Sequence, residues 1–202
     1  MSRPAAMIIL QGGAEAAAAL DIGSVRKIRW RLTVTKSNGM DIDKCFETGA
    51  VVADLVSAEK FAAIRELIKR APVFQQIPNL ASFEEAVISR EKQQSTGFGH
   101  GVAVAHGRIQ GLSRVLIGFG VSRGGISFDS ADGKPVHLLF VIASPPHLSL
   151  DYLQILSALV RCLRDKPLRE SILACPGASE METRIREALA SDLGRQACQA
   201  AN

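Results

Sequence analysis

The sequence predicts an α/β domain in which a β-sheet is layered with α-helices. Two segments with helical spacing of apolar residues come first, three β-rich apolar runs follow, and amphipathic segments come after them. This order of helices, strands and helices indicates a layered α/β arrangement. The chain has 202 residues, 47% of them hydrophobic and 22% charged, which is enough for one domain with its own core.

The two leading helices are predicted over residues 57–69 and 82–91. In the first, apolar residues repeat at helical spacing, and Ser57 is placed to cap the helix. These apolar residues are Phe61, Ile64, Leu67 and Ile68. Ser82 opens the second helix, with two glutamates in the first turn, where negative charge is favourable. This helix ends near Arg90, so that the side chain can reach over the loop that follows.

The predicted strands lie at the centre of the chain. Three β-rich apolar runs are typical of buried strands: 101–105, 114–121 and 136–143. Two groups of turn residues punctuate them: Gly124-Gly125 and Ala131-Asp132-Gly133. A long amphipathic helix and two shorter helices are predicted afterwards, over 149–163, 167–173 and 179–190.

Charge divides the chain into a basic N-terminal part and a neutral remainder. Residues 1–39 contain six basic and two acidic side chains, and residues 40–202 contain eighteen of each sign. We expect an N-terminal extension over 1–39, a domain over 40–192 and a C-terminal tail over 193–202. The extension has three interpretations: a disordered segment, a mispredicted start with the true initiator at Met40, or a basic docking tail. We favour the first two.

The composition argues against several classes of function. Residues 40–202 have no excess of basic side chains that would attract nucleic acid. A single Trp and a single Tyr are too few aromatic side chains for bases to stack on. The four cysteines have no zinc-like spacing, and the four histidines match no familiar ligand pattern, so no metal is expected. The apolar run 136–143 is too short to span a membrane. A cytoplasmic protein is therefore predicted, with its thiols reduced.

The stretch 89–108 indicates chemistry on a phosphoryl group. Arg90 carries a guanidinium, which is well suited to hold a phosphate. A loop follows whose small residues let backbone N–H groups approach a ligand closely. Its glycines stand at alternate positions: Gly97, Gly99 and Gly101. His106 comes after a short apolar run and is poised as a nucleophile or acid–base group near neutral pH.

This stretch resembles the hallmark of a known family, the fructose/mannitol class of phosphotransferase-system IIA domains, which includes the nitrogen-regulatory IIA proteins. The hallmark reads roughly REx3STGxGxGxAxPHG and contains a phosphorylated histidine. The matching residues are Arg90-Glu91, Ser95-Thr96-Gly97, Gly99, Gly101, Ala103 and His106-Gly107. Ala105 departs from it, because the family has proline there. Two later blocks, 125–146 and Asp165-Lys166, also resemble the family, so that the likeness covers about 40–189.

The resemblance implies a mixed β-sheet of about five strands with helices on both faces. It also implies that His106 carries the phosphoryl group and that Arg90 stabilises it. Ser95 and Thr96 could hydrogen-bond the imidazole or the phosphate, and the three glycines would let the loop fold beneath His106. Such a transfer needs no small-molecule cofactor and no metal.

Family members usually carry a second active-site histidine, and this sequence departs from that pattern. The corresponding position is Tyr152, which can donate a hydrogen bond to His106. With an unperturbed pKa of about 10, a tyrosine cannot share a titrating role near pH 7. His147 lies nearby but outside the register, and would substitute only if the loop shifted. The departure weakens the expectation of sugar transport and leaves phosphorylation of His106 in place.

The leading interpretation is a phosphocarrier that accepts a phosphoryl group from an HPr-type protein. We expect an exposed apolar docking ring around the histidine, with Phe98, Val104 and Leu112 as candidate members. The partner downstream is either a IIB domain, in a fructose/mannitol-type sugar uptake system, or a target protein in a nitrogen or metabolic regulatory branch, which we favour. A third interpretation is a degenerate interaction module without phosphotransfer, which Ala105 and Tyr152 support.

Overall fold

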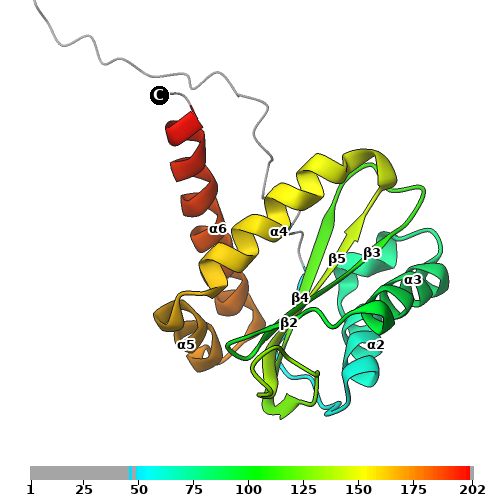
Figure 1. Cartoon of the computed structure of the whole chain (residues 1–202), viewed down its shortest axis with the longest axis horizontal. Coiled ribbons are helices and arrows are strands. Elements are labelled where there is room, and N and C mark those ends of the chain that lie inside the picture. The colour runs from blue at the N-terminus through cyan, green and yellow to red at the C-terminus, as the bar shows by residue number, and fades with distance from the viewer. Residues whose placement is uncertain (1–45, 47–48, 201–202) are drawn as a thin grey trace, which may run out of the picture. The chain divides into compact units, whose positions relative to one another are not determined.

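A five-stranded mixed sheet forms the centre of the part of the chain that the computed structural model describes, which is residue 46 and residues 49–200 (Figure 1). Its strands are β1 (Val51–Val52), β2 (Gly97–Gly99), β3 (Val102–Arg108), β4 (Leu116–Ile126) and β5 (Val136–Ser144). The strand order is β1-β4-β5-β3-β2. β1 pairs parallel with β4 and β3 parallel with β5, whereas the other two pairs are antiparallel. The predicted mixed sheet is confirmed, and the expected extension over 1–39 lies outside the described residues.

Helices precede and follow the central strands, as predicted. The described helices are α2 (Lys60–Arg70), α3 (Leu80–Gln93), α4 (Ser149–Leu163), α5 (Lys166–Ala174) and α6 (Ala178–Ala200), with short 3-10 helices η1 (Pro72–Gln76) and η2 (Pro146–Leu148). α6 is longer than the predicted segment 179–190 and takes in most of the residues expected to form a C-terminal tail. Within the described ranges, no helix is long and apolar enough to cross a membrane.

Helices cover both faces of the sheet, as the resemblance implied. Successive strand residues point to opposite faces, so His106 and Gly107 of β3 face different layers. A methyl group on Gly107 would lie 2.7 Å from Cγ2 of Val87, so α3 packs very closely on that face. The ring of His106 contacts Tyr152 of α4, which covers the other face. The side chain of His106 therefore faces the first turns of α4.

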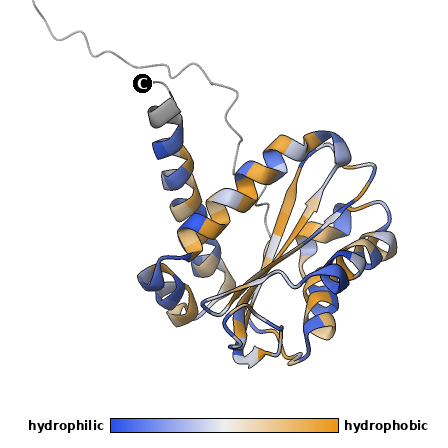
Figure 2. Ribbon diagram, viewed as in Figure 1, coloured by the Kyte–Doolittle hydropathy of each residue, from blue (hydrophilic) through white to orange (hydrophobic). Residues whose placement is uncertain are grey.

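The three long strands form most of the core. β5 is buried along its length except at its second residue, and Figure 2 shows the central strands as largely hydrophobic. Phe119 of β4 and Phe140 of β5 are register partners, and their rings stack with centroids 4.9 Å apart. Because both faces of the sheet are covered by helices, its central strands read as continuous apolar runs rather than as alternating ones.

The helix caps differ from those predicted. α2 is capped by Glu59, whose carboxylate accepts hydrogen bonds from two backbone N–H groups of the first turn. Ser57 is therefore not the cap. α3 is capped by Asn79, whose side chain accepts a hydrogen bond from the backbone N–H of Ser82. In both helices a polar side chain just before the first helical residue accepts hydrogen bonds from the first N–H groups. Each helix therefore begins after this residue and not at the predicted serine.

Two strands also run further than predicted. β3 continues through Arg108, so His106 lies within this strand rather than after it. β4 passes through Gly124-Gly125, where a turn was predicted, and the irregular register of this stretch against β5 indicates a β-bulge. Glycine in a strand can mark a bulge as well as a turn. The predicted turn at 131–133 is present.

Candidate functional site

The ring of His106 packs against the ring of Tyr152. Their centroids are 5.3 Å apart and the rings are inclined at 44°. Tyr152 is 9% exposed, whereas His106 is half-buried and keeps contact with solvent. The structure therefore brings together the two residues that the family register placed at the site. Among the described residues, no hydrogen bond joins these two side chains.

One hydrogen bond indicates which ring nitrogen of His106 carries the proton and which keeps its lone pair. Nδ1 of His106 lies 3.3 Å from the backbone carbonyl oxygen of Val104. A carbonyl oxygen can only accept, so in the neutral ring Nδ1 carries the proton and donates it to Val104. The lone pair then resides on Nε2. This tautomer makes Nε2 the nucleophilic atom of the site.

The surroundings of His106 favour the neutral imidazole. Burial lowers the pKa of His106 below its ordinary value, and the positive charges of Arg90 and Arg108 lower it further. The hydrogen bond to Val104 and the charge of Glu91 act in the opposite direction, but the net shift is downward. A neutral ring with a free lone pair is the form that can attack a phosphorus atom.

Two arginines flank the histidine. Arg90, in the last turn of α3, is half-buried, and its guanidinium donates to the backbone carbonyl of Gln94 at 3.0 Å. Arg108 is exposed and lies two residues after His106 on β3, which places both on the same face of the strand. Neither guanidinium forms an ion pair with a carboxylate among the described residues. The motif singled out Arg90, whereas Arg108 was missed, although strand alternation could have found it.

Tyr152 keeps its hydroxyl proton at neutral pH. Burial raises the pKa of Tyr152 above its ordinary value, and the charges of Arg90 and Arg108 offset only part of that rise. The side chain therefore remains an uncharged donor beside the imidazole. His147 is exposed on η2 and is not the ring that packs on His106.

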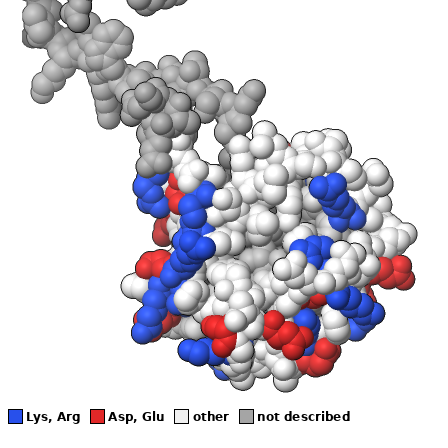
Figure 3. Space-filling model, viewed as in Figure 1, with Lys and Arg blue, Asp and Glu red and all other residues white. Residues whose placement is uncertain are grey.

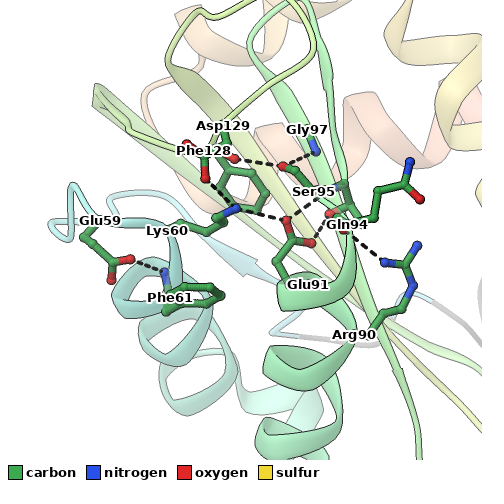
Figure 4. A network of polar contacts seen from close by, with 11 residues as sticks. Glu59, Lys60, Phe61, Arg90, Glu91, Gln94, Ser95, Gly97, Phe128 and Asp129 are labelled. Atoms are coloured by element: carbon green, nitrogen blue, oxygen red, sulfur yellow. Dashed lines mark hydrogen bonds and ion pairs between the residues drawn. The ribbon is translucent and has the colours of Figure 1, made fainter.

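The hydroxyl groups of Ser95 and Thr96 bind other protein groups. Ser95 Oγ donates to the backbone carbonyl of Phe128 at 2.9 Å, and Thr96 Oγ1 donates to Oε2 of Glu91 at 2.6 Å. Figure 4 shows these contacts around the start of the glycine loop. The structure thus engages both hydroxyl protons in holding the loop, and a direct contact of either residue with a phosphate stays a prediction.

Glu91 is the centre of that network. Its side chain is almost fully buried and also accepts a hydrogen bond from the backbone N–H of Thr96 at 2.9 Å. Nζ of Lys60 lies 3.6 Å from Oε1 of Glu91 and 2.8 Å from Oδ2 of Asp129 (Figure 4). Sequence reasoning gave Glu91 no role of its own, because Lys60 comes from a distant segment of the chain.

The glycine loop forms a tight connection beside β3. Gly97 and Gly99 belong to β2, which pairs with β3, and Gly101 follows in the turn between them. Gly99 and Gly101 have φ angles of +91° and +74°, a conformation that side chains disfavour. The loop therefore runs along the edge of β3, and its backbone shape favours glycine at these two positions.

The expected docking ring is corrected by the structure. Val104 and Leu112 are only 2% and 8% exposed, so they belong to the core, and Phe98 is half-buried. Large apolar side chains are instead exposed on the helix that carries Tyr152, at Leu150 and Leu153. Figure 3 shows a broad uncharged area on the face that α4 covers. In the described part of the chain, no three side chains are grouped to bind a metal ion.

Comparison with known proteins identifies the family. The profile described as "Phosphoenolpyruvate-dependent sugar phosphotransferase system, EIIA 2" matches residues 44–188. The chain therefore belongs to this family of phosphotransferase-system IIA domains. The sequence resemblance and the mixed α/β fold that it implied are both confirmed.

Relatives from two branches of the family match the chain about equally well. It is 34% identical over 130 residues to the fructose-specific EIIA component of Haloferax volcanii, with 64% of this chain and 84% of that protein covered. It is 32% identical over 125 residues to a nitrogen regulatory protein of Bradyrhizobium diazoefficiens, with 62% and 81% covered. The fructose-specific EIIABC component of Bacillus subtilis is 30% identical over 134 residues, covering 66% of this chain but only 21% of that longer protein.

Solved structures show the same fold. The nitrogen regulatory protein IIA-Ntr of Neisseria meningitidis superposes with a TM-score of 0.64 at 29% identity, covering 73% of this chain and 98% of that one. The mannitol IIA in complex with phosphorylated mannitol IIB from Escherichia coli gives a TM-score of 0.56 at 21% identity, with 72% and 99% covered.

Proposed function

We propose that the protein is a phosphocarrier that accepts a phosphoryl group on Nε2 of His106 from an HPr-type donor. One observation carries this proposal: a half-buried imidazole, hydrogen-bonded through Nδ1 to Val104, lies within the electrostatic influence of two arginines that lack carboxylate partners among the described residues. Preorganised positive groups of this kind stabilise the charge that develops on a phosphoryl group in transfer.

The transfer would proceed as an in-line displacement. The lone pair of Nε2 attacks phosphorus, the new N–P bond forms, and the bond from phosphorus to the donor imidazole breaks. The electron pair of the broken bond returns to the donor nitrogen. The proton on Nδ1 of His106 stays in its hydrogen bond to Val104, so the acceptor ring needs no separate base. No metal or cofactor takes part in this scheme.

The other predicted site residues support this step in our proposal. Arg90 and Arg108 bind the phosphoryl oxygens, and Tyr152 can donate its hydroxyl proton to one of them. Ser95 and Thr96 hold the loop in place through Phe128 and the carboxylate of Glu91. The exposed Leu150 and Leu153 provide the apolar contact for the donor protein.

We infer that the phosphorylation state regulates target proteins in a nitrogen or metabolic branch. Nitrogen regulatory relatives support this, and so does Tyr152, which replaces the usual second histidine. The fructose-specific relatives favour a second candidate, the IIA component of a sugar uptake system, in which a IIB domain accepts the phosphoryl group. The complex of mannitol IIA with phosphorylated mannitol IIB is an example of that kind of partner. A cytoplasmic location is part of the proposal in both cases.

Intact mass after incubation with phosphoenolpyruvate, enzyme I and HPr tests the carrier function. Wild type should gain one acid-labile phosphate, and His106→Ala should gain none. A IIA domain of known activity serves as the positive control. If that control is labelled and wild type is not, the carrier mechanism with this donor is wrong, and the degenerate interaction module becomes the better account.

A further inference from the structure

The pairing of β2 with β3 lacks one expected hydrogen bond next to His106. Gly97 lies opposite Ala103, which places Thr96 opposite Val104 in the same antiparallel register. Opposite residues of an antiparallel pair alternate between pairs that exchange two backbone hydrogen bonds and pairs that exchange none, and the bond between Val104 and Thr96 shows that these two are of the first kind. The N–H of Val104 donates to the carbonyl of Thr96 at 3.3 Å. The N–H of Thr96 does not return the bond, but donates to Oε1 of Glu91 at 2.9 Å.

The carbonyl of Val104 is thereby left to the histidine. Its oxygen lies 3.3 Å from Nδ1 of His106 and accepts the ring proton. If the backbone N–H of Thr96 completed the strand pair, it would compete with Nδ1 for this oxygen. A carbonyl oxygen has two lone pairs, so a second donor would weaken the hydrogen bond to Nδ1 rather than exclude it, and this bond is strongest when the N–H of Thr96 is directed elsewhere.

Glu91 is held so that it can only accept. The hydroxyl of Thr96 donates to its second oxygen at 2.6 Å, and Nζ of Lys60 lies 3.6 Å from the first. The residue is 2% exposed, and its two oxygens are occupied by two donors and one cation. An ionised carboxylate accepts the N–H of Thr96 without offering a proton that could compete elsewhere.

We propose that Glu91 is a positioning residue that sets the tautomer of His106. Because Glu91 accepts the hydrogen bond from the N–H of Thr96, the carbonyl of Val104 accepts only the proton on Nδ1 of His106. Nε2 is then unprotonated. The effect on phosphotransfer rests on the proposed function, but the tautomer exists in the protein alone and is measured without any donor.

Nitrogen-15 NMR of the ring nitrogens, at a pH above the pKa of His106, reports which nitrogen carries the proton. In wild type the proton should reside on Nδ1. Glu91→Leu removes the acceptor, so the population with the proton on Nε2 should rise, and the rate of phosphorylation by HPr should fall on the order of tenfold, as for other partners that orient functional histidines. Glu91→Gln keeps an acceptor oxygen and should retain the wild-type tautomer. Glu85→Leu, at an exposed position of the same helix, is the matched control and should change neither readout.

The design separates positioning from stability. Glu91→Leu leaves the buried Lys60 with Asp129 alone, so the variant Lys60→Met/Glu91→Leu removes both charges in case the single variant does not fold. A wild-type His106 protonated on Nε2, or an unchanged tautomer in the folded leucine variants, would overturn the proposal. A shifted tautomer with an unchanged phosphorylation rate would overturn its link to transfer. If wild type is not phosphorylated at all, the proposed function fails, while the tautomer still decides the role of Glu91.

Discussion

A histidine that accepts a phosphoryl group must present an unprotonated nitrogen, and three features provide this for His106. The carbonyl of Val104 holds the ring proton on Nδ1, and burial disfavours the charged ring. The two nearby guanidiniums disfavour it further, although the same charges would stabilise the phosphorylated product. The two arginines that favour the neutral imidazole before transfer would thus also stabilise the phosphoryl group after transfer.

The two arginines should contribute unequally to transfer. Arg90→Ala should slow phosphorylation of His106 by about a hundredfold, and Arg108→Ala by about tenfold, because the exposed Arg108 interacts through more solvent. Arg164→Ala, at an exposed position at the end of α4, is the control and should leave the rate unchanged. Stopped reactions with limiting HPr, followed by intact mass, give the rates. Equal rates in Arg90→Ala and wild type would contradict the role of Arg90.

The pH dependence of His106 is a separate prediction. Its NMR titration midpoint should lie below the ordinary value of 6.5, and Arg108→Ala should raise that midpoint. Since the unfolded chain then binds this proton more readily than the folded protein, the contribution of His106 to stability is lost as the pH falls from about 6.5 through the lowered pKa. A midpoint above the ordinary value would show that burial does not dominate at this ring.

The residues that sequence reasoning found are those that stand close together in the chain. His106, Arg90 and the glycines belong to one short stretch, and their local pattern was sufficient. Arg108 was missed because the strand was expected to end before the histidine. The network around Glu91 could not be predicted, because Lys60 and Asp129 reach it only through the fold. Val104 was placed at the surface, since an apolar side chain next to a site gives no signal of which face it occupies.

At the scale of elements, the close packing of α3 on β3 positions the site. Alternation places Ala103, Ala105 and Gly107 on the strand face that α3 covers, and their small size lets the helix approach. Ala105 stands where the family has proline, and it lies on the same face of the strand. In this segment the backbone groups of odd-numbered residues point towards β5, as the hydrogen bond from the N–H of Ile109 to the carbonyl of Ser144 shows. Alanine at position 105 therefore has a backbone N–H on the side of β5, which proline would lack.

Enlarging Gly107 should separate the helix from the strand. Gly107→Ala places a methyl group 2.7 Å from Cγ2 of Val87, so we expect a loss of about 1–3 kcal/mol in the free energy of unfolding. Val87→Ala in the same chain should restore part of it by making room. Gly124→Ala, whose added methyl would meet nothing within 4 Å, is the matched control. Urea unfolding measures all of these, and an undiminished stability of Gly107→Ala would contradict the close packing.

Element types were predictable from periodicity, whereas their ends depended on local chemistry and tertiary contacts. The helices and long strands were found because apolar residues recur at the spacing of each structure. The cap Asn79 was missed because Ser82 is an equally good cap in sequence alone, and Glu59 because serine is preferred to glutamate at this position. β2 was taken for a loop, since a three-residue strand rich in glycine carries no periodic signal.

At the scale of the whole described domain, the C-terminal helix supports the helix that carries Tyr152. α6 packs against α4 and β1. Nε and Nη2 of Arg161 on α4 lie 3.1 and 2.8 Å from Oδ2 of Asp192 on α6. Asp192 is 7% exposed, so this bond is partly shielded from water. Residues 193–200 therefore extend a helix that begins within the family match.

Breaking this contact should loosen the C-terminal helix. Asp192→Ala removes the carboxylate that accepts from Nε and Nη2 of Arg161, so the free energy of unfolding should fall by about 1–2 kcal/mol. Glu187→Ala, at an exposed position of α6, is the control and should have little effect. Hydrogen exchange should show faster exchange in α6 of the Asp192 variant. Unchanged exchange and stability would mean that apolar packing alone holds this helix.

The measurement that tests the central claim most directly is phosphorus–nitrogen NMR of the protein labelled with nitrogen-15 histidine and phosphorylated through HPr. One-bond and longer-range couplings identify the ring and the nitrogen that carry the phosphorus. The account predicts a single phosphoryl group on Nε2 of His106, with Nδ1 still protonated towards Val104. A phosphoryl group on Nδ1, on another residue, or on none would contradict it.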